Sequence, residues 1–253
     1  MSSSKIAVIV LGAAGKMGVK IVEKIRNNSH CALAGAFDLK TSGSAPIAQD
    51  LESALQSADA VIDFTAPAAS AAHAVLCAGY KKPLVIGTTG FDGDQLTLLR
   101  ELSKTCPIFL SPNMSPAVNL TIAVARLMAA KLPGFDIHIS ETHHKFKKDA
   151  PSGTALKYQA RIKEIYRGEV PVTSTRAGDI IGEHTVLYAG PHERVELTHR
   201  AHSRDVFAEG AIRAALWLKD QKPGIYDYFD LLDLGVLLRM APDAEHGHKF
   251  ENL

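Results

Sequence analysis

Two adjacent histidines and a nearby lysine stand out in the segment Glu141-Thr-His-His-Lys-Phe-Lys-Lys-Asp-Ala-Pro-Ser-Gly-Thr154. His143 and His144 end a stretch with strand character, and Lys147 follows within the same short span. A histidine can donate a proton near neutral pH, and a lysine offers positive charge to an anion. A lone histidine is more often structural. This density of proton donors and cations, however, predicts a site that binds an anionic small molecule and protonates it.

The same segment ends in a Pro-Ser-Gly-Thr turn directly before a helical pattern of apolar residues. Ser152 or Thr154 can cap this helix, which would be a purely structural role. Their hydroxyls, together with free N–H groups and the positive end of the helix dipole, also favour a carboxylate. The two roles are compatible, so we predict an anion pocket at this helix start.

A glycine-rich turn, Gly12-Ala-Ala-Gly-Lys-Met-Gly18, follows the apolar run Ile6–Leu11 and precedes a second helical pattern. In that context the turn and the helix N-terminus can bind a pyrophosphate. The spacing G-x-x-G-x-x-G differs from the common G-x-G-x-x-G, and a tight turn without a ligand is the structural alternative. The context favours a dinucleotide site, and its predicted residues are Gly12, Ala13, Ala14, Gly15, Lys16 and Met17.

Asp38 follows the last glycine by about 20 residues, where an acidic residue can accept hydrogen bonds from the ribose hydroxyls of NAD. An aspartate at a strand end is also a common turn former. Lys16 and Lys40 can offer charge to the additional phosphate of NADP. We therefore predict that both NADH and NADPH serve as cofactor.

Two small-residue loops follow the fourth and fifth predicted strands. They contain Gly87, Thr88 and Thr89 in the first, and Ser111, Pro112, Asn113 and Met114 in the second. Either loop alone could be a simple connection. Because ligands bind at the carboxyl ends of strands in open α/β sheets, we predict that both contribute to the cofactor site.

The elements that must hold these residues change character along the chain. Strand-like apolar runs at 6–11, 32–37, 60–64, 84–86 and 108–110 alternate with helical patterns at 70–78 and 94–104. This alternation is typical of an α/β, Rossmann-like, doubly wound parallel sheet. After a long helical pattern at 118–132, the segments 135–142, 185–188 and 194–202 alternate apolar and polar residues instead. They predict a second, α+β domain with a mostly antiparallel sheet.

These patterns place the domain boundaries. Residues 1–114 form the predicted dinucleotide-binding domain, and 204–253 complete it, since helical patterns at 207–218 and 226–240 are expected to pack back on the first sheet. Residues 115–203 form the predicted substrate-binding domain.

Composition excludes several classes of function. The 253 residues include 28 Lys and Arg against 27 Asp and Glu, a net charge of +1 that attracts neither nucleic acid nor an anionic membrane. Three cysteines without a Cys-x-x-Cys pair argue against a disulfide framework or a zinc ribbon. The apolar run Ile6–Leu11 is too short for a membrane span. We expect a cytoplasmic protein, or one in an organelle stroma if a transit peptide precedes this sequence, without a nucleic-acid or membrane partner.

The motifs together resemble the dihydrodipicolinate reductases, also called 4-hydroxy-tetrahydrodipicolinate reductases. The central block, Glu141-x-His-His-x-x-Lys147-x-Asp-Ala-Pro-Ser-Gly-Thr-Ala155, is the most specific. The other blocks, in family order over nearly the whole chain, are Gly12-Ala-Ala-Gly-Lys-Met-Gly18, Asp63-Phe-Thr65, Gly87-Thr-Thr-Gly90 and Arg176-Ala-Gly-Asp-Ile-Ile-Gly-Glu-His-Thr185.

The resemblance implies NAD(P)H-dependent reduction of 4-hydroxy-tetrahydrodipicolinate, via dihydrodipicolinate, to tetrahydrodipicolinate in lysine and diaminopimelate biosynthesis. It makes His143 the general acid and Lys147 its cationic partner, with His144, Gly153 and Thr154 holding the carboxylates of the substrate. Hydride addition to a cyclic imine builds electron density on the ring, and general acid catalysis of its protonation contributes roughly 10² to 10⁴ in rate.

The resemblance also implies NAD(P)H contacts at residues 12–17, Asp38, 87–89 and 111–114, and a homotetramer assembled through the second-domain sheet. Because the site is divided between two domains, closure over the substrate is a further hypothesis. Three features depart from the family: Phe146 stands where a histidine is common, the segment between Asp38 and Asp63 is short enough to suggest a trimmed loop or a missing edge strand, and Gly235 to Leu253 have no assigned role.

Other functions remain as alternatives. Another two-domain NAD(P)-dependent reductase, acting on a small carboxylate, a semialdehyde or a sugar, has no reason to need the His-His-x-x-Lys block. A non-catalytic NAD(P)H-binding sensor would make His143 and Lys147 dispensable. A metal hydrolase using His138, His143 and His144 lacks the spacing of a known zinc motif, so no metal site is predicted.

Overall fold

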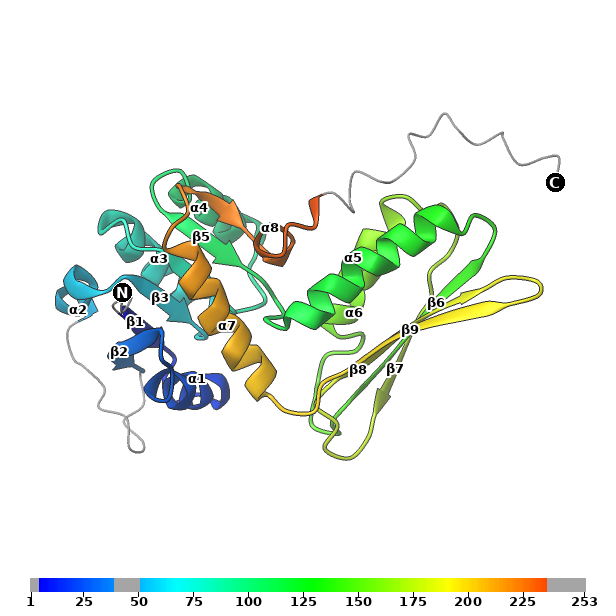
Figure 1. Cartoon of the computed structure of the whole chain (residues 1–253), viewed down its shortest axis with the longest axis horizontal. Helices are drawn as coiled ribbons and strands as arrows, with labels where there is room; N and C mark the ends of the chain where they lie inside the picture. The colour runs from blue at the N-terminus through cyan, green and yellow to red at the C-terminus, as the bar shows by residue number, and fades with distance from the viewer. Residues whose placement is uncertain (1–4, 39–50, 236–253) are drawn as a thin grey trace. The chain divides into compact units, whose positions relative to one another are not determined.

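The computed structural model describes residues 5–38 and 51–235, which form two compact units (Figure 1). The first contains the described residues up to Pro116 together with Ser203–Leu231. The second contains Ala117–His202 and the described residues from Leu232. Lys40 and residues 236–253 lie outside the described residues, so the predicted role of Lys40 towards NADP stays a prediction.

The first unit is built on a six-stranded parallel sheet with the order β10-β5-β4-β3-β1-β2. Its strands are β1 (Ile6–Leu11), β2 (Cys31–Phe37), β3 (Ala60–Asp63), β4 (Leu84–Ile86), β5 (Pro107–Leu110) and β10 (Gly224–Tyr226). The central strands β3 and β4 are buried at every position, as expected for strands covered on both faces. The predicted doubly wound parallel sheet is confirmed.

Helices cover both faces of this sheet. They are α1 (Lys16–Arg26), α2 (Leu51–Ser57), α3 (Pro67–Gly79), α4 (Gly93–Leu102), α7 (Asp205–Leu218) and α8 (Tyr228–Leu231). Side chains of α2, α3 and α4 join Ile9 and Leu11 of β1 in one apolar cluster. On the other face, α7 packs against α1 and against β3, β4 and β5, and Figure 1 shows α1 and α7 together. The prediction that 207–218 pack back on the first sheet is confirmed.

Two segments of the first unit bear on predictions made from the sequence. β2 is an edge strand of the described sheet, and the segment after Asp38, where a trimmed loop or a missing edge strand is predicted, lies largely outside the described residues. The prediction of a helix over 226–240 is wrong at its start, because β10 includes Tyr226 and α8 is a single turn at Tyr228–Leu231. Pairing with β5, which no local pattern reveals, is what makes residues 224–226 a strand.

The second unit contains a four-stranded sheet with the order β7-β6-β8-β9. Its strands are β6 (Asp136–His143), β7 (Val172–Arg176), β8 (Glu183–Ala189) and β9 (Arg194–Arg200). β6 runs antiparallel to β8 and parallel to β7, and β8 is antiparallel to β9. The predicted mostly antiparallel sheet is confirmed, although β7, which contains a single aliphatic residue, is too polar for a hydrophobic pattern to reveal.

Two helices, α5 (Pro116–Lys131) and α6 (Gly153–Lys163), pack on one face of this second sheet. The hydroxyl of Tyr188 on β8 donates a hydrogen bond of 2.6 Å to the carbonyl of Ala125 on α5. Along β6 burial alternates, so that Ile137, Ile139, Glu141 and His143 lie on this covered face. Strand periodicity therefore brings a carboxylate and an imidazole side by side. No described helix of either unit is both long and apolar enough to cross a membrane.

Candidate active site

A buried carboxylate and imidazole form the centre of the site in the second unit. Glu141 and His143 are two residues apart on β6, so both side chains point to the same face. Glu141 is 1% exposed and His143 is 8% exposed. Nδ1 of His143 and Oε2 of Glu141 form a short hydrogen bond. The other ring nitrogen, Nε2, is therefore the one left to exchange a proton with a ligand.

Arg176 compensates the charge of this carboxylate. It ends β7, and the parallel pairing of β7 with β6 places it opposite His143. Its Nη1 donates to Oε2 of Glu141 at 3.0 Å and its Nη2 donates to Oε1 at 2.8 Å. The backbone N–H of Ser152 donates to Oε1 as well, at 3.2 Å. Burial raises the pKa of Glu141, but hydrogen bonds from Arg176, Ser174 and His143 outweigh it and hold this pKa at about 2.

The pKa of His143 lies below its ordinary value, because here the effect of burial outweighs that of the hydrogen bond. Burial lowers it most, Glu141 raises it, and the positive charges of Lys147 and Arg176 lower it again. Glu141, ionised above a pKa of about 2, accepts from Nδ1–H and selects the tautomer whose Nε2 carries a lone pair. His143 is thus a neutral, oriented imidazole in the absence of a ligand.

A glycine and a second histidine surround this imidazole. A Cβ atom at Gly182 would lie 3.0 Å from Nε2 of His143, so a side chain there would crowd this nitrogen. The ring of His184 on β8 contacts that of His143 edge-on, with 5.2 Å between ring centroids. Burial, followed by the neighbouring His143, lowers the pKa of His184 to about 3. His184 is therefore a neutral ring that packs against His143 without adding a charge.

The start of α6 is tied to the same pair. Ser152 is the N-cap: its Oγ accepts from the N–H of Ala155 and pairs with Nε2 of His184, both at 3.2 Å. Thr154 is buried and Gly153 is exposed in the first turn, which contains no acidic residue. The predicted capping role of Ser152 is thus present, and the helix start predicted to bind an anion lies beside the Glu141–His143 pair.

The loop between β6 and α6 carries the remaining predicted residues. Nζ of Lys147 pairs with the Asp149 carboxylate at 2.9 Å, and its backbone N–H donates to the carbonyl of His144 at 3.1 Å. Nδ1 of His144 is buried and has no hydrogen-bond partner among the described residues. Phe146 is 71% exposed, with Nζ of Lys145 5.1 Å from the centre of its ring. The centre of the Phe146 ring lies 6.3 Å from that of His144.

Sequence reasoning missed the roles of Glu141, Arg176 and His184, although all three lie within the motifs. The apolar residues Ile137 and Ile139 identify the buried parity of β6, and extending this parity reaches Glu141 and His143. For Arg176 and His184 the sequence contains no comparable signal, because strand pairing across separate segments brings them to Glu141.

The predicted nucleotide loops gather at one edge of the first sheet. The turn after β1 is held by hydrogen bonds from the N–H groups of Gly12 and Ala13 to the carbonyl of Phe37, at 2.9 and 3.0 Å. Gly12 has a φ of +79°, which favours glycine. The N–H of Ala14 donates to Asp38 at 2.9 Å, so Asp38 also orders the turn.

Helix α1 begins at this turn with an open N-terminus. Its N-cap, Gly15, provides no side-chain hydrogen bond, and the first turn contains the exposed Lys16 but no acidic residue. The first N–H groups of a helix have no partner inside it, so an anion such as a phosphate is stabilised there. A Cβ atom at Gly18 would collide with the carbonyl of Gly12, which keeps the helix close to the turn.

The other two predicted loops follow neighbouring strands at the same edge. Residues 87–89 follow β4, where Thr88 is 6% exposed and Thr89 is exposed. Residues 111–114 follow β5, and the carbonyl of Met114 accepts a hydrogen bond of 2.7 Å from the hydroxyl of Tyr228. Because β1, β3, β4 and β5 are adjacent and parallel, all three loops emerge together.

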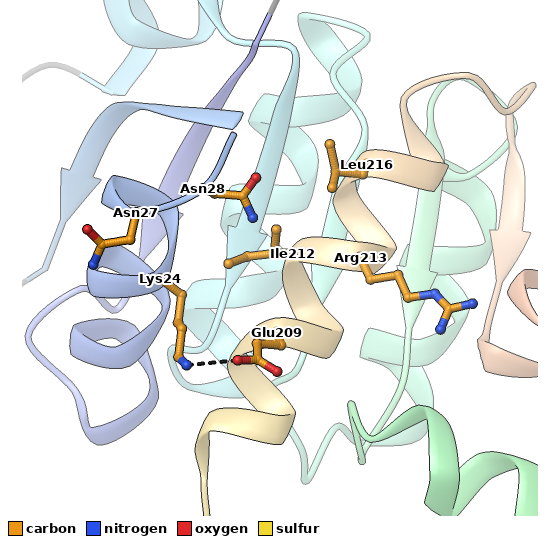
Figure 2. A pocket seen from close by; sticks show the side chains of 7 residues that line it. All are labelled: Lys24, Asn27, Asn28, Glu209, Ile212, Arg213 and Leu216. Atoms are coloured by element: carbon orange, nitrogen blue, oxygen red, sulfur yellow. Dashed lines mark hydrogen bonds and ion pairs between the residues drawn. The ribbon is translucent and has the colours of Figure 1, made fainter. Parts of the chain in front are cut away.

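A surface pocket in the first unit is unrelated to these residues. It lies between α1 and α7 and is lined by Lys24, Asn27, Asn28, Glu209, Ile212, Arg213 and Leu216 (Figure 2). Nζ of Lys24 pairs with Glu209 at 2.7 Å, so its charge is already compensated. At about 1.5 Å per residue, the pocket's end of α1 lies roughly 18 Å from the glycine turn. It is not part of the candidate active site.

The geometry also bears on a metal site. Ligand atoms of Glu141, His143 and His184 lie within 4.8 Å of one another. Both oxygens of Glu141 already face the guanidinium of Arg176, whose charge would repel a cation at this point. His138, a ligand in the hydrolase alternative, lies on the opposite face of β6 from His143. The arrangement favours proton transfer, and the absence of a metal stays a prediction.

Comparison with known proteins identifies related chains. Residues 6–114 match the family described as "Dihydrodipicolinate reductase, N-terminus", and residues 117–232 match "Dihydrodipicolinate reductase, C-terminus". The chain is 40% identical over 263 residues to the 4-hydroxy-tetrahydrodipicolinate reductase of Aquifex aeolicus, covering 90% of this chain and 99% of the relative. It is 39% identical over 260 residues to the enzyme of Syntrophus aciditrophicus, covering 88% and 97%.

Solved structures show the same fold. A dipicolinate-bound dihydrodipicolinate reductase from Paenisporosarcina is similar, with a TM-score of 0.77, 26% identity, and coverage of 90% of this chain and 99% of that chain. A probable dehydrogenase from Thermotoga maritima has a TM-score of 0.64 at 10% identity, covering 93% and 95%, which shows likeness of fold alone.

The buried ion pair can be tested with Glu141→Gln. This change leaves Arg176 and His143 facing a neutral amide, so we expect a loss of about 2 kcal/mol in the free energy of unfolding. Because the pKa of Glu141 is depressed from 4.5 to about 2, its contribution is present above pH 4.5 and is lost as the pH falls towards 2. Urea unfolding followed by circular dichroism at several pH values measures both effects.

Glu183→Gln is the matched control, since Glu183 forms an exposed ion pair with Arg200 on the same sheet, at 3.4 Å. Its loss should cost less than about 0.5 kcal/mol at any pH. Equal stability of the two variants would contradict the assigned role of Glu141.

Proposed function

Because the chain belongs to the dihydrodipicolinate reductase family, and is therefore an NAD(P)H-dependent oxidoreductase of lysine and diaminopimelate biosynthesis, we propose that Glu141, His143 and Arg176 form its proton-donating centre. The reaction reduces 4-hydroxy-tetrahydrodipicolinate, via dihydrodipicolinate, to tetrahydrodipicolinate. The observation that carries the assignment is the buried carboxylate–imidazole pair, with Nδ1 of His143 bound to Glu141 and Nε2 left for the substrate.

Binding of the dicarboxylate substrate is proposed to involve Lys147, His144, Ser152, Gly153 and Thr154. The start of α6 offers N–H groups and a helix dipole to one carboxylate. His144, whose Nδ1 has no partner within the described residues, and the ammonium of Lys147 offer a donor and a charge to the other. Lys147 would then leave Asp149 and pair with the substrate. Its ion pair with Asp149 lies at the surface, so losing it costs little free energy.

Substrate binding supplies the charge that loads the general acid. Free His143 has a depressed pKa because it is buried and lies near Lys147 and Arg176, against which only Glu141 raises it. Two substrate carboxylates add negative charge to this site and neutralise those cations, which raises the pKa of the imidazole. Nε2 thereby takes up the proton that it donates to the ring during reduction. Water exclusion around the buried pair strengthens this electrostatic coupling.

The first unit fits a nicotinamide dinucleotide. Residues 12–17 offer a helix N-terminus without a side-chain cap, and the loops 87–89 and 111–114 flank it at the same sheet edge. NAD(P)H, when bound, supplies the hydride. Asp38 favours the free ribose hydroxyls of NAD, whereas the exposed Lys16 suits the phosphate of NADP. We therefore propose use of both cofactors.

The second-unit sheet is the proposed assembly surface of a homotetramer. Its covered face is occupied by α5 and α6, whereas the opposite face carries a polar row in which the hydroxyls of Thr185 and Thr198 are 3.0 Å apart. A cytoplasmic location remains part of the proposal, because three free cysteines suit a reducing compartment.

The activity test uses freshly made product of dihydrodipicolinate synthase and follows oxidation of NADH and of NADPH. We expect oxidation of both, with values of kcat/KM that differ by less than about a hundredfold, because neither ribose-binding feature excludes the other cofactor. Oxidation of neither would refute the substrate. Oxidation of one alone would refute dual use.

The role of His143 is tested by His143→Gln, with His192→Gln in an exposed turn of the same unit as control. Loss of a general acid should lower kcat by roughly 10² to 10⁴, whereas binding of dipicolinate, measured by calorimetry, should weaken much less. The control should retain its activity. Unchanged turnover in His143→Gln would support the non-catalytic sensor instead.

The pH dependence follows from the direction of the His143 pKa. Since this pKa is depressed in the free protein, kcat/KM should fall with rising pH from below the ordinary histidine value of 6.5. Because the substrate carboxylates raise the pKa, kcat should persist to higher pH. Initial rates between about pH 5 and 9 measure both profiles. Profiles that coincide would contradict loading of the acid by substrate.

A further inference from the structure

A second buried carboxylate lies in the first unit, among the predicted cofactor loops. Asp63 ends β3 and is fully buried. Its Oδ1 accepts hydrogen bonds from the N–H of Thr65 at 2.8 Å, the hydroxyl of Thr65 at 2.7 Å and the hydroxyl of Thr88 at 3.2 Å. Its Oδ2 pairs with Nδ1 of His73 at 2.7 Å. Among the described residues no lysine or arginine pairs with Asp63, so His73 is its one basic partner there.

These four hydrogen bonds join three separate segments. Thr65 belongs to the loop after β3, Thr88 to the loop after β4, and His73 to α3. Thr88 lies within the segment proposed to contact the nicotinamide dinucleotide, and its hydroxyl is held by a carboxylate that α3 anchors. Since α3 packs in the apolar core through Ala74 and Cys77, the anchor is a rigid one.

Phe64, between Asp63 and Thr65, packs against both the glycine turn and the 87–89 loop. A Cβ atom at Gly12 would lie 2.5 Å from the carbonyl of Phe64, so the glycine turn packs directly on this backbone. A Cβ atom at Gly87 would collide with the ring of Phe64. Orientation of the Asp63–Thr65 segment therefore decides the relative position of the glycine turn and the 87–89 loop.

We propose that Asp63 and His73 are positioning residues of the cofactor site, and that their pair fixes Thr88 and the Asp63–Thr65 segment in the geometry that binds the nicotinamide dinucleotide. Neither residue needs to touch the cofactor. The inference rests on the proposed function of the 12–17 and 87–89 loops and adds the device that holds them in register. His73 donates from Nδ1, so loss of this donor frees Oδ2 of Asp63 and loosens the three-segment junction.

His73→Leu removes the donor, whereas His73→Asn keeps an N–H group at a similar distance from the backbone. In His73→Leu we expect the Kd for NADH, measured by fluorescence titration, to rise about tenfold, the effect of losing one hydrogen bond to a charged group. His73→Asn should stay within about threefold of the wild type. At saturating NADH, kcat should change far less than KM in both variants. Dipicolinate affinity, a property of the second unit, should not change.

Ser70→Ala is the control on the same helix, because Ser70 is fully buried and its hydroxyl has no partner among the described residues. It should bind NADH as the wild type does. If His73→Leu does not fold, Thr88→Val with Thr88→Ser as its rescue tests the same junction, since only serine keeps the hydroxyl that Asp63 accepts.

Two failures are distinguishable. A wild-type protein that binds neither NADH nor NADPH would overturn the proposed function and this inference with it. A wild-type protein that binds NADH, with His73→Leu binding equally well, would overturn the inference alone. Weakened NADH binding in His73→Leu that His73→Asn fails to restore would also overturn it, because the effect would then come from packing and not from the hydrogen bond.

Discussion

Burial of an ionised carboxylate has a large free-energy cost unless other groups compensate its charge, and the second unit is arranged around this constraint at Glu141. Arg176 binds both carboxylate oxygens, Ser174 and the N–H of Ser152 donate as well, and His143 pairs through Nδ1. These donors come from three segments, so the carboxylate links β6, β7 and the start of α6. The same carboxylate pairs with Nδ1 of His143 and leaves Nε2 for the proposed proton transfer, so the fold and the proposed chemistry depend on one interaction.

The first unit shows a related arrangement with a different purpose. Asp63 is also buried at the end of a strand and also binds a histidine through Nδ1, but its remaining partners are hydroxyl and backbone donors and no described cation joins them. In the proposed roles, Glu141 orients a proton donor, whereas Asp63 orders the loops of the cofactor site. In both units a buried carboxylate near the carboxyl end of a strand holds side chains from neighbouring segments in fixed positions.

Much of this organisation is predictable from the sequence because it depends on local patterns. Each of these patterns spans only a few neighbouring residues: the apolar runs that form β1, β3 and β4, the alternation of β6, the glycine turn and the Ser152 cap. Contacts between distant segments are not. Arg176 meets Glu141 only because β7, which has few apolar residues, pairs with β6, and His73 meets Asp63 only because α3 folds back beside β3. One block contains His143, Glu141 and the resemblance to reductases, but Arg176 and His184 become their neighbours only through strand pairing.

The central claim is that Glu141, held by Arg176, fixes the tautomer and the pKa of His143. Nuclear magnetic resonance of protein containing ¹⁵N-labelled histidine measures both directly, with His143→Gln used to assign the signals. The account predicts a neutral imidazole protonated at Nδ1 in the free protein, with a pKa below 6.5 that rises when dipicolinate binds. A neutral ring protonated at Nε2, or a pKa that dipicolinate leaves unchanged, would contradict it.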